Sequence, residues 1–183
     1  MTSNRLAQLS QRMASVTLLL IVAMLLLNAA MWLFPGLSTV GAGFALTERQ
    51  LPIIADQALL FTWWQVLGGI VLSSVPLLAL AGGLGHLRRL FQGYAKGVYF
   101  SADSAQHLGK VGRAVAIWVL LDFVCEPLLS MWVTLHAPAG EHLITISFTP
   151  PTFVALFLAA CISIIARILG QASEVDSENR SFV

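Results

Sequence analysis

The sequence has 183 residues, of which 57% are hydrophobic and 10% charged, and its formal net charge is +1. Soluble domains carry about 25% charged residues, so a water-soluble fold with so few charges would expose apolar surface that it could not cover. The composition therefore indicates an integral membrane protein, and the small net charge argues against direct binding to nucleic acid, which normally requires a strong basic excess.

Four apolar segments are long enough to cross a bilayer, which takes about 20 mostly apolar residues in a helix. The first follows Arg5 and Arg12, as in a signal peptide, but its apolar run continues through Trp32 and Phe34, which favours a retained span. The sequence thus predicts an all-α fold, an integral membrane four-helix bundle that forms one domain over residues 1–183. The expected spans are residues 13–34, 58–85, 114–135 and 150–169.

Positive charge alternates along the chain between the segments that flank the spans. Lys and Arg are concentrated before span one, in the loop 86–112 and after span four, whereas residues 136–149 contain neither. Because cytoplasmic segments carry the excess of Lys and Arg, the two termini and the loop 86–112 are expected to face the cytoplasm. Amphipathic indole rings prefer a membrane interface, and four are expected at the opposite one: Trp32, Trp63, Trp64 and Trp132.

Two carboxylates lie inside the third span, and they are the most informative polar residues. Asp122 and Glu126 are four residues apart, so they share one helix face. A charge at that depth costs roughly 2.5–3.5 kcal/mol, so both are expected to face the protein interior, with at least one protonated at neutral pH. They form either a proton or cation site or a structural pair. In the structural case the expected hydrogen-bond partners are Asn28, Gln65, Ser73 and Ser74.

Other chemistry-bearing residues do not form a recognisable catalytic or cofactor site. The four histidines lie in or beside loops, and none faces another from within a span, which disfavours a haem. His136, Glu141 and His142 are near enough in sequence to suggest a metal, but an ordinary solvated loop is the preferred interpretation. We therefore expect a protein that is not an enzyme and that carries no metal and no cofactor.

Small residues at four-residue spacing are typical of helix contacts inside membranes. Ala155, Ala159 and Ser163 follow this spacing in span four, and Gly69 and Ser73 do so in span two. We expect these stripes to pack inside the bundle rather than to form a dimer face.

The loop between spans two and three is predicted to contain two helices. Residues 84–94 have helical apolar spacing and are expected to continue span two along the inner membrane surface. Gly97 is expected to end that helix, and Ser101 to cap the next. Phe100 should then anchor the turn against the bundle.

This loop also carries a resemblance to a known family. The segment FQGYAKGVYFS (91–101), the glycines Gly109 and Gly112, and a tail that runs from residues 166–170 to an acidic Glu-Asn pair at 178–179 resemble the DUF2975 family of bacterial membrane proteins. The family-like loop residues are Gly97, Phe100, Ser101, Gly109 and Gly112. The resemblance implies four spans, no established activity, and members that are paired with small helix-turn-helix regulators.

The function expected from these features is a regulatory or sensing role in the bacterial inner membrane, exerted through the cytoplasmic loop and tail. One alternative is a small proton- or cation-coupled transport protein that uses Asp122 and Glu126. Another is an accessory subunit of a larger membrane complex. The partners expected are the lipid bilayer together with a helix-turn-helix regulator or such a complex, and a homo-oligomer stays open.

Overall fold

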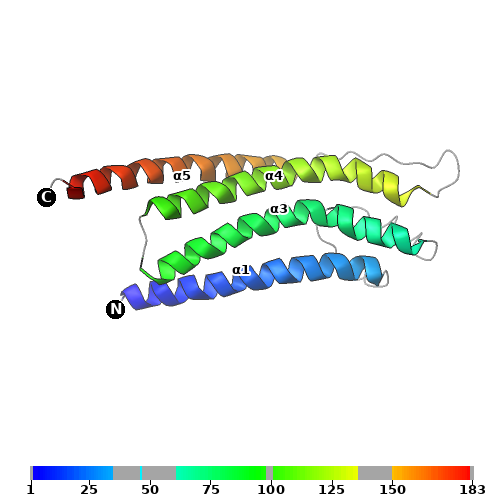
Figure 1. Cartoon of the computed structure of the whole chain (residues 1–183), viewed down its shortest axis with the longest axis horizontal. Coiled ribbons are helices and arrows are strands. Elements are labelled where there is room, and N and C mark those ends of the chain that lie inside the picture. The colour runs from blue at the N-terminus through cyan, green and yellow to red at the C-terminus, as the bar shows by residue number, and fades with distance from the viewer. Residues whose placement is uncertain (1, 35–45, 47–60, 98–100, 136–149, 182–183) are drawn as a thin grey trace. The chain divides into compact units, whose positions relative to one another are not determined.

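The computed structural model describes residues 2–34, 46, 61–97, 101–135 and 150–181. It contains four long helices, and the described residues include no strand (Figure 1). The helices are α1 (Thr2–Leu33), α3 (Trp63–Ala95), α4 (Ala102–Val133) and α5 (Pro150–Ser181). All four are long and apolar enough to cross a membrane. The predictions of an all-α fold and of a multi-pass membrane protein are thereby confirmed.

The helices are longer than the spans expected from hydropathy. Each has 32 or 33 residues, which corresponds to about 48 Å at a rise of 1.5 Å per residue. The apolar core of a bilayer is about 30 Å thick. The segment 86–112 is therefore mostly the end of α3 and the start of α4, and residues 84–94 continue α3 as one helix. Backbone hydrogen bonding is local, so a helix continues past the apolar stretch until a breaker ends it.

The breaker in this case is the turn predicted between α3 and α4. Gly97 has φ = 83°, a left-handed conformation that glycine adopts without strain. The backbone N–H groups of Lys96 and Gly97 donate to the carbonyl oxygens of Gly93 and Tyr94, each at 3.0 Å, which closes the last turn of α3. Ser101 Oγ accepts the N–H of Ser104 at 3.1 Å and caps α4. The predicted helix end and helix start are both confirmed, while Phe100 lies outside the described residues.

The chain divides into two compact units, which we describe separately. Unit 1 consists of Met1–Ile21, Ala79–Ile117 and Pro150–Val183, and therefore includes parts of α1, α3 and α4 and the whole of α5. Unit 2 consists of Val22–Leu78 and Trp118–Thr149, and includes parts of α1, α3 and α4.

In unit 2, two tryptophans pack against adjacent glycines of α3. A Cβ added to Gly69 would collide with the ring of Trp32, and one added to Gly68 would collide with the ring of Trp132. The indole of Trp32 donates to Ser73 Oγ at 3.2 Å. The indole of Trp132 donates to the carbonyl oxygen of Gln65 at 3.0 Å. Each ring is therefore held on α3 by both packing and a hydrogen bond.

The four tryptophans expected at a membrane interface differ in how they contact the protein. The side chains of Trp63 and Trp64 are 62% and 71% exposed, as an interfacial ring should be. Trp32 is 3% exposed and Trp132 is partly buried. These two rings serve helix packing, because glycine leaves a hollow on α3 that only a large neighbour fills.

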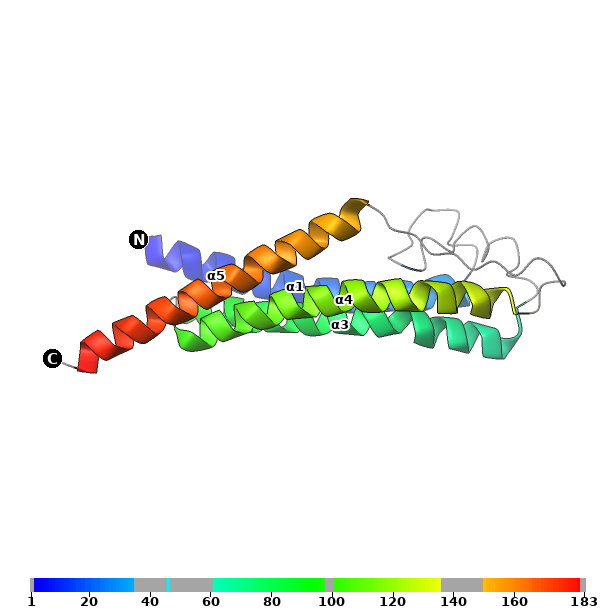
Figure 2. The same cartoon turned by 90° about the horizontal axis from the view of Figure 1, so that it is seen from above.

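In unit 1, α4 and α5 meet through small residues, and Figure 2 shows α5 crossing the first part of α4 obliquely. A Cβ added to Gly112 would lie 2.5 Å from Ser163 Oγ and 2.9 Å from the carbonyl oxygen of Ala159. One turn away, the Cβ position of Gly109 lies 3.6 Å from the Cβ of Ala166. Ala159 and Ser163 thus pack inside the protein, as expected of the small-residue stripe in the fourth span.

Candidate functional site

The two intramembrane carboxylates lie on the buried face of α4 in unit 2. Asp122 is 7% exposed and Glu126 is 1% exposed. The buried residues of this part of α4 recur at intervals of three and four, as one face of a helix does: Asp122, Cys125, Glu126, Leu129, Ser130 and Val133. The prediction that both carboxyl groups face the interior is confirmed.

Of the polar residues expected to surround the carboxyl groups, Asn28, Gln65 and Ser73 are buried in the same unit and Ser74 is half-buried. Asn28 is 1% exposed, and its Nδ2 donates to Ser73 Oγ at 3.0 Å and to Ser74 Oγ at 3.1 Å. The Gln65 side chain caps the start of α3, since its Oε1 accepts the backbone N–H of Thr62 at 3.0 Å. Unit 2 therefore has a core in which carboxyl, amide and hydroxyl groups from α1, α3 and α4 are buried together.

The chemistry available to this core is that of proton binding and hydrogen bonding. Residues 13–34, 63–85, 114–135 and 150–166 contain no Lys or Arg, so those segments provide no basic group to pair with a buried carboxylate. A carboxyl group in that setting is most stable when it is protonated and hydrogen-bonded. Asp122 and Glu126 accordingly suit either a structural role or the uptake and release of a proton.

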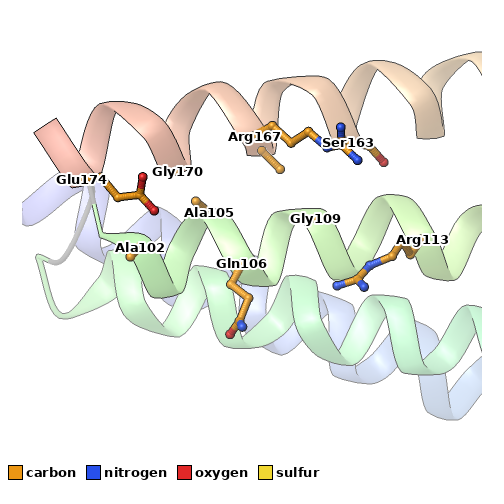
Figure 3. A pocket seen from close by; sticks show the side chains of 10 residues that line it. Ala102, Ala105, Gln106, Gly109, Arg113, Ser163, Arg167, Gly170 and Glu174 are labelled. Carbon is orange, nitrogen blue, oxygen red and sulfur yellow. The ribbon is translucent and has the colours of Figure 1, made fainter.

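A second candidate site is a cavity between α4 and α5 in unit 1. Its volume is about 490 Å³. Figure 3 shows Arg113 on α4 and Arg167 on α5 at one end of the cavity, and Glu174 on α5 towards the other. The remaining lining is Ala102, Ala105, Gln106, Gly109, Ser163, Ala166 and Gly170. Most of these lining residues have small side chains. They allow the backbones of α4 and α5 to approach closely, but they do not fill the volume beside the contact.

The glycines singled out in the sequence have distinct places in this region. Gly97 makes the left-handed turn after α3, Gly109 lines the cavity, and Gly112 is the close contact with α5. The three glycines therefore belong to the turn after α3 and to the region where α4 and α5 meet.

The sequence matches the family model described as "Protein of unknown function (DUF2975)" over residues 17–181. This chain belongs to the DUF2975 family. No curated protein matches it, and no solved structure does.

A histidine pair in this DUF2975 protein was missed by the sequence analysis. His86 Nδ1 on α3 and His107 Nδ1 on α4 are 3.2 Å apart, and the ring centroids are 5.4 Å apart. His107 Nε2 lies 3.6 Å from Asp103 Oδ2. Both rings lie just outside the apolar spans expected from the sequence, and the sequence-based expectation about facing histidines concerned only those spans. Both helices continue beyond the apolar spans. His86 and His107 are about equally far in sequence from the turn at Gly97, so the turn brings them side by side.

Metal binding has no support among the described residues, where no group of three or more His, Cys, Asp or Glu could hold an ion. The sequence cluster of His136, Glu141 and His142 lies outside the residues that the structure describes. Cys125 is buried and Cys161 is partly buried, and both are free thiols.

Proposed function

We propose that this DUF2975 protein is a non-enzymatic regulatory or sensing protein of the bacterial inner membrane, which acts through the α3–α4 turn and α5. The observation that supports this is the way α5 is held. Only 11% of its most apolar stretch is buried, compared with 28–33% in the other three helices. Elements with few buried contacts rearrange at low cost, so α5 is the helix most able to respond to a bound partner.

The contact between α4 and α5 also favours movement. It consists of small side chains and glycine, with a cavity of about 490 Å³ beside it. Smooth, small-residue contacts hold helices by close approach rather than by interlocking side chains. A ligand or partner that enters the cavity beside Arg113 and Arg167 would displace α5 and carry the signal along its 32 residues.

The cytoplasmic side of the membrane is the proposed location of unit 1. Every Lys and Arg among the described residues belongs to unit 1, where they are Arg5, Arg12, Arg88, Arg89, Lys96, Lys110, Arg113, Arg167 and Arg180. This distribution is what the positive-inside rule expects of a cytoplasmic end. A cytoplasmic position would let a soluble regulator contact α5, which is the partner we propose.

Site-specific photo-crosslinking tests this role. A photoreactive residue at the exposed Gln171 of α5 should capture one soluble protein in cells, and the same residue at the exposed Phe153 should not. Capture at Gln171 should change in the Gly112→Ala variant, which alters the contact between α4 and α5. It should not change in Gly82→Ala, where the added Cβ meets nothing within 4 Å. Capture of subunits of a membrane complex at both positions would favour an accessory subunit, and capture at neither position would contradict the proposal.

The buried pair Asp122 and Glu126 supports a second candidate, a small proton-coupled transport protein. The specific observation is that both groups are buried on one face, at 7% and 1% exposure. In that case Asp122→Asn should abolish proton flux in proteoliposomes while the fold persists. The control is Asp103→Asn, which removes a carboxylate that is 77% exposed. Equal flux in the parent and both variants would exclude this second candidate.

A further inference from the structure

We infer that a cleft between α1 and α3 in unit 1 binds the phosphate diester of an anionic phospholipid, with Arg88 and Lys96 as its charge partners. The cleft has a volume of about 550 Å³. Its lining is Gln11, Ala14, Ser15 and Leu18 from α1, and Arg88, Gln92, Ala95 and Lys96 from α3. This inference is independent of the regulatory role proposed above.

The charge of the lining selects an anion. The eight described residues that line the cleft include two cations and two amides but no Asp or Glu. Guanidinium and ammonium groups that converge on one cleft without a carboxylate repel each other until an anion enters. Phosphate oxygens match such donors, because guanidinium binds them in two parallel hydrogen bonds and ammonium binds them as a point charge.

The hydrogen bonding of Arg88 independently indicates that an acceptor for its side chain binds in the cleft. Its Nε is buried, and none of the described residues accepts a hydrogen bond from it. Buried donors of this kind are nearly always satisfied, since leaving one unmet carries the full desolvation penalty. Arg88 is one of the residues that line the cleft, so an anion bound there is a fitting acceptor for this N–H.

The position of the cleft along α1 favours a lipid over a small dissolved anion. The lining on α1 changes from Gln11, which precedes the expected span, to Leu18, which lies within it. The adjoining surface of α1 is apolar and open, with Val16 at 57% and Leu19 at 70% exposure. A phospholipid with its headgroup in the polar part of the cleft would therefore place its acyl chains beside α1. Basic pockets between membrane helices bind anionic headgroups in this way.

Native mass spectrometry of the full-length protein in mild detergent tests the inference. The delipidated protein is titrated with phosphatidylglycerol and, separately, with phosphatidylcholine. Both lipids carry the phosphate diester, but the choline ammonium of the second would be repelled by Arg88 and Lys96. The first lipid should therefore bind about tenfold more tightly. Equal retention of the two lipids would overturn the proposal.

Matched variants separate a defined site from diffuse surface charge. Arg88→Gln and Lys96→Gln should each weaken phosphatidylglycerol binding about tenfold, whereas Arg89→Gln, which removes the same charge from the exposed neighbour outside the cleft, should not. Arg88→Lys keeps the charge but removes the Nε donor, so it should also weaken phosphatidylglycerol binding. This variant replaces Arg88→Gln in the test if Arg88→Gln does not fold. Equal losses in Arg88→Gln and Arg89→Gln would refute a defined site.

A competition experiment with inorganic phosphate distinguishes a lipid headgroup from a free phosphate ion as the ligand of the cleft. Sodium phosphate at millimolar concentration should leave phosphatidylglycerol binding unchanged when total ionic strength is held constant with chloride. Displacement of the lipid by phosphate, with loss of that displacement in Arg88→Gln, would mean that a free anion is the ligand and would overturn the lipid assignment.

Discussion

Gly112 of α4 lies directly against Ser163 of α5, so that a Cβ added to the glycine would be 2.5 Å from the serine Oγ. It would also be 2.9 Å from the backbone carbonyl oxygen of Ala159. The serine hydroxyl could turn aside, but Ser163 Oγ already donates to that same carbonyl at 2.8 Å, and the backbone cannot move without moving the helix. This contact sets how closely α4 and α5 approach.

Gly112→Ala should therefore displace α5 and destabilise the protein. Overpacking costs about 1–3 kcal/mol, while alanine in place of glycine returns about 1 kcal/mol of helix propensity. Gly109→Ala is the matched control, because its Cβ would lie at an ordinary 3.6 Å from Ala166. Thermal unfolding in detergent should give a lower Tm for Gly112→Ala and an equal or higher Tm for Gly109→Ala. The same Tm for both variants would contradict the packing described.

Gly69→Ala should disrupt the seat of Trp32 in unit 2. The added methyl group would collide with the indole ring, which is 3% exposed and has little room to withdraw. We expect a loss of about 1–3 kcal/mol from overpacking, together with weakening of the hydrogen bond from the indole to Ser73. Gly82→Ala on the same helix is the control, since its Cβ would meet nothing within 4 Å. Unfolding curves of the two variants should differ, with Gly82→Ala at least as stable as the parent.

The histidine pair should make the α3–α4 contact sensitive to acid. With Nδ1 atoms 3.2 Å apart, one ring must donate its N–H and the other must accept it. When both rings are protonated, both nitrogens carry hydrogens and the acceptor is lost. The contact is therefore present when at most one ring is charged. Burial, and then the neighbouring charge of His107, lower the pKa of His86 below its usual value, so the contact is lost only as the pH falls below that lowered pKa.

Thermal stability at about pH 7.5 and about pH 5 measures this effect within the ordinary range of histidine titration. The parent protein should lose more stability on acidification than His86→Gln, in which the second ring is absent and no opposed N–H groups can form. A drop of equal size in both proteins would show that the pair is not the acid-sensitive element.

The fold was predictable because its signals are local. Apolar length identified the four helices, Gly97 and Ser101 identified the turn, and the cost of burying a charge placed Asp122 and Glu126 in the interior. The partnerships of His86 with His107 and of Trp32 with Gly69 were not predictable. They depend on the rotation and register of neighbouring helices, and in a membrane protein hydropathy does not fix these, because lipid-facing and core-facing residues are both apolar.

The proposed topology makes a direct prediction for intact cells. A cysteine placed at Gln92, which is exposed on α3 in unit 1, should be protected from a membrane-impermeant thiol reagent and labelled after permeabilisation. The basis is the concentration of Lys and Arg in unit 1. A background variant in which Cys125 and Cys161 are replaced by serine removes the native thiols. Labelling of position 92 before permeabilisation would show that the protein has the opposite orientation in the membrane.

The protonation of Asp122 and Glu126 is the last prediction, and it separates a structural pair from a functional one. Both side chains are at most 7% exposed, and burial away from water disfavours the ionised form of a carboxyl group relative to the protonated acid. At least one group should therefore be protonated at neutral pH. Infrared difference spectra across a pH titration should show a protonated carbonyl band that disappears in Asp122→Asn or in Glu126→Gln.

The stability of Asp122 variants then distinguishes a structural from a functional role for the pair. Asp122→Asn should change the free energy of unfolding little, because an amide replaces a protonated acid in size and in hydrogen bonding. Asp122→Leu should lower stability by about 1–3 kcal/mol, since it leaves the polar groups around it without a partner. If Asp122→Asn retains stability yet abolishes a measured proton flux, the pair is functional. If flux is absent in the parent protein and only Asp122→Leu is destabilised, the pair is structural. Two ionised carboxylate bands at neutral pH, with no protonated band from either residue, would show the protonation argument to be wrong.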